Sequence, residues 1–217
     1  MRSELRFAAF IAYSPRGQSK TSIRSQQICY GIKTDGPSAE KGVSMISYAV
    51  RRLVENAPPE VLKILRKDSV LVPIPRHAPF APGTEAKTLW VAREICGTLV
   101  RAGLAARVLP CLRRDTAVTK SAGADHRPPP ETHRRSFRVT REIGESPERI
   151  VLVDDVVTRG STFMGAAWAL DAAFPGAQID AFALVRTKGL IPDVDQVLEP
   201  VTGKIFMRTP TACDREP

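Results

Sequence analysis

The apolar residues of this chain occur in two patterns, and the order of these patterns predicts a fold. Val43, Ile46, Val50 and Leu53 recur at spacings of three and four, which is the period of an amphipathic helix within residues 40–55. Further helical stripes and the continuous apolar runs typical of buried strands follow along the chain: helices at 89–100 and 163–174, strands at 69–75, 106–110, 149–153 and 179–185. Because the strands alternate with helices, the pattern predicts an α/β fold in which helices flank an open, mainly parallel sheet.

The first forty residues have a different pattern. Two short β-like runs, at 5–13 and 25–33, are separated by a polar stretch rich in turn-forming residues. We interpret these runs as a β-hairpin that forms a small hood beside the main domain at 41–208. The polar residues 209–217 are expected to form a frayed tail.

Residues 113–138 interrupt the alternation of strands and helices. They carry seven Lys or Arg against three Asp or Glu, three consecutive prolines and almost no apolar periodicity, which predicts a mobile basic loop. Such a loop could close over a site as a lid, or it could simply be solvated. His126 and His133 lie in this loop, and we assign no role to either.

Composition narrows the class of protein. The 217 residues, 43% of them hydrophobic, suffice for one substantial core, and no break in composition marks a second. The apolar run at 7–12 is too short to span a bilayer and no cleavage pattern follows it, so we expect a cytoplasmic protein. The four scattered cysteines form no C-x-x-C pair, which favours buried, reduced thiols over a zinc site or a disulfide framework.

The charge of the chain indicates a polyanionic partner. Lys and Arg number 32 against 23 Asp and Glu, a net charge of +9, which suits a phosphorylated small molecule, a nucleic acid or both. The sequence contains no helix-turn-helix, zinc finger or aromatic-interleaved strand, so we expect nucleic-acid binding to be weak and sequence-independent at most. Motifs of the P-loop, dinucleotide, zinc-protease and nucleophile-elbow types are also absent.

One segment combines the features that a sugar phosphate requires. The strand at 149–153 leads into Asp154 and Asp155, whose adjacent carboxylates suit two neighbouring ribose hydroxyls. A short loop then opens a helix, where unpaired backbone N–H groups and the positive end of the helix dipole favour a phosphate. Its residues are Val156, Val157, Thr158, Arg159, Gly160, Ser161 and Thr162. The plainer alternative is an ordinary strand-to-helix turn in which the Asp pair caps the helix.

This segment resembles the signature of the type I phosphoribosyltransferases, which bind 5-phosphoribosyl 1-pyrophosphate (PRPP). In that signature two acidic residues follow a hydrophobic strand and precede a T-x-G-x-T-like loop, which reads Thr158-Arg159-Gly160-Ser161-Thr162 here. The resemblance implies that Asp154 and Asp155 are the catalytic acidic pair and that residues 156–162 bind PRPP.

A wider resemblance, over roughly residues 26–186, is to the ComF family. It rests on the segments 27–33, 70–76 and 134–139 together with the acidic turn. ComF-like proteins have the type I phosphoribosyltransferase fold and are associated with DNA uptake in some bacteria. The amino-terminal zinc module usual in that family is absent here, and the arginine-rich stretch after its V-P-x-P strand is reduced to Arg76 and His77.

The resemblance implies a chemistry and further site residues. Such enzymes move the phosphoribosyl group from PRPP to an acceptor while Mg²⁺ bridges pyrophosphate oxygens and ribose hydroxyls, so Mg²⁺ is expected near Asp154 and Asp155 and held through PRPP. Donors aimed at the departing pyrophosphate should stabilise the transition state. Our candidates for these donors are Arg76, Arg113, Arg114, Lys120, Arg134 and Arg135.

Three functions are compatible with these sequence features. The leading one is Mg²⁺-dependent transfer of a 5-phosphoribosyl group to a nitrogenous acceptor, or the reverse reaction. The second is a non-catalytic regulator that senses PRPP or a nucleotide, or a ComF-like protein associated with DNA uptake. The third is phosphoester or nucleotide-ribose chemistry at the same acidic turn. The acceptor would be recognised by residues 1–40 or 189–207, which contain no residue pattern that identifies a particular base. Whether the protein forms a homodimer is left open.

Overall fold

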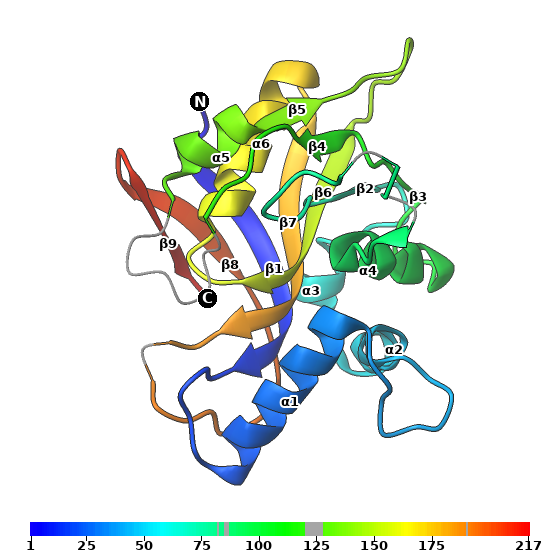
Figure 1. Cartoon of the computed structure of the whole chain (residues 1–217), viewed down its shortest axis with the longest axis vertical. Coiled ribbons are helices and arrows are strands. Elements are labelled where there is room, and N and C mark those ends of the chain that lie inside the picture. The colour runs from blue at the N-terminus through cyan, green and yellow to red at the C-terminus, as the bar shows by residue number, and fades with distance from the viewer. Residues whose placement is uncertain (82, 85–86, 120–127, 190) are drawn as a thin grey trace.

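A computed structural model of the chain describes residues 1–81, 83–84, 87–119, 128–189 and 191–217. The described residues form a seven-stranded sheet in the order β3-β2-β6-β7-β1-β8-β9 (Figure 1). The five strands from β3 to β1 are parallel, while β8 and β9 continue the sheet in antiparallel pairs. The bounds are β1 Glu4–Tyr13, β2 Val70–Pro73, β3 Arg107–Val108, β6 Arg149–Val157, β7 Gln178–Thr187, β8 Leu198–Thr209 and β9 Ala212–Glu216.

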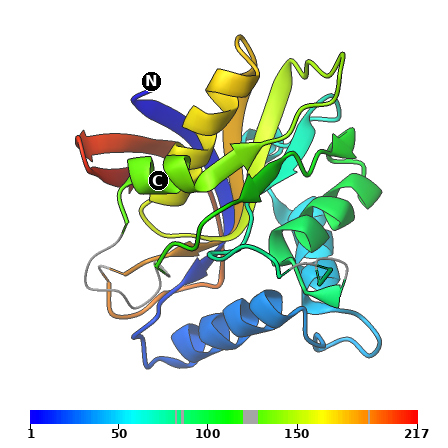
Figure 2. The same ribbon diagram turned by 45° about the horizontal axis from the view of Figure 1, so that its top comes forward.

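Helices cover both faces of this sheet, as Figures 1 and 2 show. On one face, side chains of α1, α2 and α4 form a core cluster with one side of the strands, and α6 forms a second cluster on the other face. A small sheet of β4 and β5 lies beside α5 and α6. The bounds are α1 Lys20–Thr34, α2 Met45–Asn56, α3 Pro59–Leu62, α4 Val91–Arg101, α5 Pro130–Ser136, α6 Ser161–Ala173, β4 Leu112–Arg114 and β5 Phe137–Val139. The predicted α/β class with a mainly parallel sheet flanked by helices is confirmed.

The predicted amino-terminal hairpin is wrong. The first run is β1, but it lies inside the sheet between β7 and β8, buried on both faces. The second run belongs to α1, which begins at a cap where the Ser22 N–H donates to the Ser19 hydroxyl at 3.1 Å. The buried positions of α1 include Ser22, Ser25, Cys29 and Ile32, spaced three and four apart. Because two of the four are serines, the helical stripe is not apolar and the period could not be recognised.

The carboxyl-terminal prediction is also wrong, because residues 209–217 are not a frayed tail. Ala212–Glu216 forms β9 and pairs with β8 from Thr209 to Lys204. Strand β8 in turn pairs with β1, so this hairpin extends the main sheet. Cross-strand hydrogen bonds hold a polar segment as firmly as an apolar one, and composition alone did not indicate them.

Residues 113–138 are more ordered than the predicted loop. Their described parts contain Arg113 and Arg114 of β4, the helix α5 and the beginning of β5, while residues 120–127 lie outside the described residues. Helix α5 packs against α6 at Gly165, where an added Cβ would come within 2.4 Å of the Pro130 carbonyl oxygen. The prolines at 128–130 therefore lead into a helix whose first turn tolerates them.

No helix among the described residues is long and apolar enough to cross a membrane.

Candidate functional site

The segment singled out in the sequence lies where β6 ends and α6 begins. Asp154 and Asp155 belong to β6 itself, and the strand continues through Val157 before the chain turns. The carboxyl ends of the parallel strands lie along this edge of the sheet, which is where ligands bind in open α/β sheets. The predicted strand, turn and helix are therefore present. The acidic pair lies within the strand and not in the turn that follows it.

The 158–162 turn leaves the first amide groups of α6 open to a ligand. Gly160 is the N-cap residue and has a φ of 90°, a left-handed conformation that glycine adopts freely. No side chain in the described part of the chain caps this helix, so its first N–H groups face outward with the positive end of the helix dipole behind them. This arrangement favours an anion such as a phosphate.

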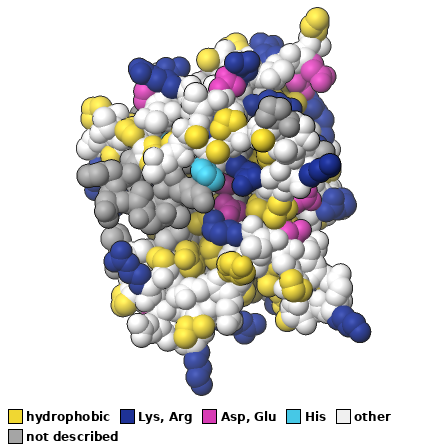
Figure 3. Space-filling model, in the orientation of Figure 1, with side chains coloured by type: hydrophobic (Ala, Val, Ile, Leu, Met, Phe, Trp, Pro, Cys, Tyr) yellow, Lys and Arg dark blue, Asp and Glu magenta, His cyan; other side chains and the backbone are white. Residues whose placement is uncertain are grey.

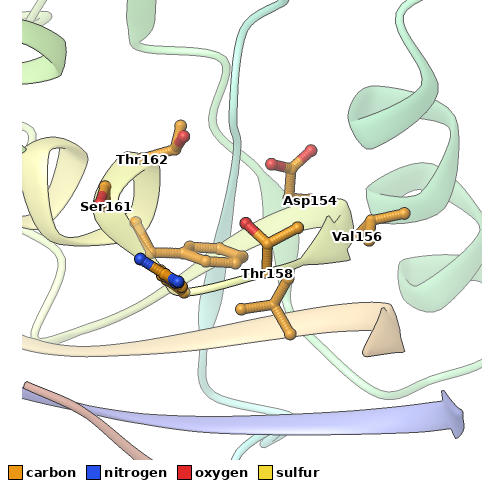
Figure 4. A pocket seen from close by; sticks show the side chains of 9 residues that line it. Asp154, Val156, Thr158, Ser161 and Thr162 are labelled. Atoms are coloured by element: carbon orange, nitrogen blue, oxygen red, sulfur yellow. The ribbon is translucent and has the colours of Figure 1, made fainter. Parts of the chain in front are cut away.

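A small hollow lies over the turn. The side chains of Asp154, Thr158, Ser161 and Thr162 surround it, with the strand residue on one side and the first helical turn on the other (Figure 4). Its complete lining is Asp154, Val156, Val157, Thr158, Arg159, Gly160, Ser161, Thr162 and Phe163. A carboxylate and three hydroxyl groups therefore line one small space, in a strand-to-helix arrangement that suits a sugar phosphate.

The two carboxylates of the acidic pair lie in different surroundings. Each one accepts the N–H of the following residue, Asp155 onto Asp154 Oδ1 and Val156 onto Asp155 Oδ1, both at 2.9 Å. Asp155 also accepts from the Lys33 ammonium at 2.7 Å. Burial, and then the neighbouring Asp155 charge, raises the pKa of Asp154 well above its ordinary value.

Lys33 is a site residue that the sequence analysis did not identify. It lies in the last turn of α1, more than a hundred positions from Asp155, and was assigned to a strand. The Asp155 carboxylate holds the pKa of Lys33 above its usual value despite partial burial. No local pattern links two residues so far apart in the sequence, so only the tertiary structure could find this pair.

A second group of side chains approaches the turn from β4, α5 and β5. The Arg114 guanidinium is buried, donates from Nε to the Arg76 carbonyl oxygen at 2.7 Å and from Nη1 to the Ser136 hydroxyl, and stacks 4.2 Å above the Phe137 ring. Burial lowers the pKa of Arg114 to about 10, while the charge of Asp154 raises it, so the guanidinium stays charged at neutral pH. Arg114 is therefore a fixed cation that interacts with the charge of Asp154.

His133 joins this group, although no pattern in the sequence assigned it a role. Its Nε2 lies 3.4 Å from the Thr162 hydroxyl, and its buried Nδ1 has no hydrogen-bond partner in the described structure. Burial, and then the charge of Arg114, lowers the pKa of His133 to about 4. The imidazole is therefore neutral at physiological pH and contacts the turn as an uncharged group.

The other predicted cations differ in their exposure and in their ion pairs. Arg134 and Arg135 both pair with Glu131 within α5, at 2.6 and 2.8 Å, so this single carboxylate offsets one of their two charges. Arg76 and Arg113 are exposed, Arg76 beside the Arg114 contact and Arg113 on β4. Lys120 lies outside the described residues. Arg114 interacts with the charge of Asp154, and the Arg76 carbonyl oxygen accepts a hydrogen bond from it.

The surface around the site combines both signs of charge. Basic and acidic side chains lie next to one another near the middle of this face of the molecule, beside a histidine (Figure 3). Within the described residues, no group of three or more His, Cys, Asp or Glu side chains could hold a metal ion. The two carboxylates suit Mg²⁺, which prefers oxygen ligands and commonly takes several from substrate phosphates and water. A Mg²⁺ ion held near Asp154 and Asp155 through a phosphorylated ligand stays a prediction.

Comparison with known proteins names no family for this chain. No family model and no curated protein matches it. Among solved structures, a hypoxanthine phosphoribosyltransferase from Staphylococcus aureus is similar to it, with 13% identity and a TM-score of 0.33 over 71% of this chain and 69% of the other. A likeness at this level has no bearing on function, and a likeness to the ComF family is not shown.

Proposed function

We propose that this protein binds PRPP at the β6–α6 turn and transfers its 5-phosphoribosyl group to a nitrogenous acceptor. The observation that carries the proposal is the hollow in which an acidic strand end meets the uncapped start of α6. A ribose 5-phosphate has both complementary parts, a diol for carboxylates and a phosphate dianion for amide groups. A turn that only connected a strand to a helix would not require both.

Each part of the site has a role in this reaction. The N–H groups at the start of α6 and the hydroxyls of Thr158, Ser161 and Thr162 hold the 5-phosphate. We assign the ribose hydroxyls to the acidic pair, of which Asp154 lines the hollow and Asp155 is held beside it by Lys33. The bond from C1′ to the pyrophosphate oxygen breaks, a bond from C1′ to the acceptor nitrogen forms, and that nitrogen loses its proton. Bound beside Asp154 and Asp155 through PRPP, Mg²⁺ would neutralise charge on the phosphate oxygens.

The leaving group takes up negative charge, so nearby cations accelerate its departure. Arg114 is our candidate for this role because its guanidinium is fixed by Arg76, Ser136 and the Phe137 ring before any ligand arrives. A cation held in place needs no reorganisation as the charge develops. Arg76 extends the same group toward solvent.

Calorimetry with PRPP and Mg²⁺ tests the binding step. We expect wild-type protein to bind PRPP, and the double variant Asp154→Asn with Asp155→Asn to bind it about 10²- to 10⁴-fold more weakly, because two hydrogen bonds to charged groups contribute about 3–6 kcal/mol. Asp68→Asn is the control, since Asp68 is exposed and pairs with Arg66 and Arg149 at the other end of the sheet. Unchanged affinity in a folded double variant would contradict the site.

A screen of nitrogenous bases for pyrophosphate release tests the transfer step. Release with one acceptor class, lost in the double variant and kept in Asp68→Asn, supports the transferase. Binding of PRPP without turnover of any acceptor would instead favour a non-catalytic PRPP sensor on the same site.

A further inference from the structure

The underside of the 158–162 turn is built from the hairpin of β8 and β9. Ile205 of β8 lies directly beneath Gly160, where an added Cβ would come within 2.5 Å of the isoleucine side chain. Arg215 of β9 reaches the turn from the same side and is not part of the lining of the hollow. The side of the turn that faces the hollow is therefore formed by residues 154–163, and the opposite side is supported by residues of β8 and β9.

Arg215 makes an unusual set of contacts for a partly buried arginine. Its Nε donates to the Thr158 carbonyl oxygen, and its Nη2 donates to the Thr187 carbonyl oxygen at the end of β7. It forms no ion pair with any described residue, although buried arginines are usually paired with carboxylates. Burial, and then the charge of Arg186, lowers the pKa of Arg215 to about 10, which leaves the guanidinium charged at neutral pH.

The contact with Thr158 fixes the direction of the next N–H group. A peptide unit is planar and trans, so its carbonyl oxygen and its N–H hydrogen point in opposite directions. Because Arg215 holds the Thr158 carbonyl on the underside of the turn, the N–H of Arg159 points toward the opposite side, where the hollow lies. The hydrogen bond from a charged donor also polarises that peptide and strengthens its N–H as a donor.

We propose that Arg215 is a positioning residue, whose guanidinium orients the Thr158–Arg159 peptide so that the Arg159 N–H binds the 5-phosphate of the ribosyl ligand. This inference rests on the proposed function, since it concerns the phosphate subsite of that ligand. The second bond, to Thr187, ties the turn to the end of β7 and prevents the peptide from rotating. Arg215 itself touches no ligand.

Arg215→Met tests this role, because it keeps the length of the apolar stem and removes both donors. We expect the Kd for ribose 5-phosphate to rise about tenfold, which corresponds to one misdirected hydrogen bond to a charged group. The Kd for inorganic pyrophosphate should stay unchanged, because the donors proposed for it are Arg114 of β4 and Arg76. Guanidinium ion added to the variant should restore part of the affinity for ribose 5-phosphate.

Two further variants complete the test. Arg208→Met is the control, since Arg208 is an exposed arginine of the same hairpin that pairs with Asp214 at 3.6 Å and does not contact the turn. Arg215→Lys carries the same test if the methionine variant does not fold, because one ammonium nitrogen replaces the two guanidinium nitrogens that reach the Thr158 and Thr187 carbonyls separately. In labelled wild-type protein, the Arg159 amide resonance should shift on addition of ribose 5-phosphate and should shift less in either Arg215 variant.

The outcomes separate this inference from the proposed function. Wild-type protein that binds neither PRPP nor ribose 5-phosphate would overturn the proposed function. Wild-type binding with equal affinity in the Arg215 variants would overturn only the role of Arg215. An equal loss of affinity for ribose 5-phosphate and pyrophosphate in a folded variant would also overturn it, because that result indicates a general structural role.

Discussion

Gly160→Ala tests the close packing of the 158–162 turn against Ile205 of β8. Two costs add at this position, and both can be estimated from the structure. An alanine in the left-handed conformation costs about 1–2 kcal/mol, and Gly160 has a φ of 90°. The new Cβ would also lie 2.5, 2.7 and 2.8 Å from three side-chain carbons of Ile205. Crowding of a packed core costs about 1–3 kcal/mol more. We therefore expect the free energy of unfolding to fall by about 2–5 kcal/mol in total.

A second glycine separates the two costs. Gly176 also has a φ of 90°, but an added Cβ there would have nothing within 4 Å. Gly176→Ala should therefore lose only the backbone part, about 1–2 kcal/mol. Ile205→Ala removes the three crowding carbons, so Gly160→Ala should cost no more than the backbone part in that background, a coupling of about 1–3 kcal/mol between the two sites.

Urea unfolding of the four variants measures these differences, provided that the slope of the transition is unchanged. Ribose 5-phosphate binding by Gly160→Ala should be weakened as well, since the turn must shift away from Ile205. The reasoning is refuted if Gly160→Ala costs no more than Gly176→Ala, or if the cost persists in full without the Ile205 side chain.

Three other predictions follow from the titratable groups and the surface charge. Because the pKa of His133 falls from 6.5 in the unfolded chain to about 4 in the fold, its contribution to stability is present above about pH 6.5 and is lost as the pH falls toward 4. Between pH 7 and pH 5 the wild type should therefore lose about 2 kcal/mol more stability than His133→Gln, and equal losses in urea titrations would contradict the burial of this imidazole. All four cysteines are free and buried, and burial raises their pKa values, so a thiol reagent at pH 8 should react with the native protein only as fast as it unfolds. Fluorescent single- and double-stranded DNA should bind weakly, without sequence preference and only at low salt, and PRPP should compete; tight binding near physiological salt would instead favour a nucleic-acid function.

The sequence predicted those elements whose buried side is apolar. The helices at 40–55, 89–100 and 163–174 correspond to α2, α4 and α6, and the runs at 69–75 and 149–153 to β2 and β6. Helix α1 was missed because serines occupy part of its buried side. Helix α5 was missed because its buried positions are Pro130, His133 and Ser136, which carry no apolar period.

The candidate site likewise has one part that the sequence predicted and one part that it did not. The 154–162 segment is contiguous, so order and composition alone indicated its chemistry, and the structure places it as a strand, a turn and an uncapped helix. Lys33, His133 and Arg215 reach it from α1, α5 and β9, and their partners lie far away in sequence. Long-range hydrogen bonds of this kind depend on which strands become neighbours, and no periodicity along the chain records that choice.

The interior place of β1 has a consequence for how the molecule is made. Phe7 pairs with Ala181 of β7 and with Gly203 of β8, so the first strand has no sheet partner until most of the chain exists. At roughly 5–20 residues per second, a ribosome needs on the order of ten to forty seconds to reach those partners. During that interval an apolar strand with unpaired edges is exposed, which is the kind of segment that chaperones bind and that aggregates when they do not. Pairing across so many residues also makes closure of the sheet slow. The contacts that support the 158–162 turn come from β8 and β9, which follow all the helices in the chain, so on synthesis we expect ligand binding to appear after the helices have formed.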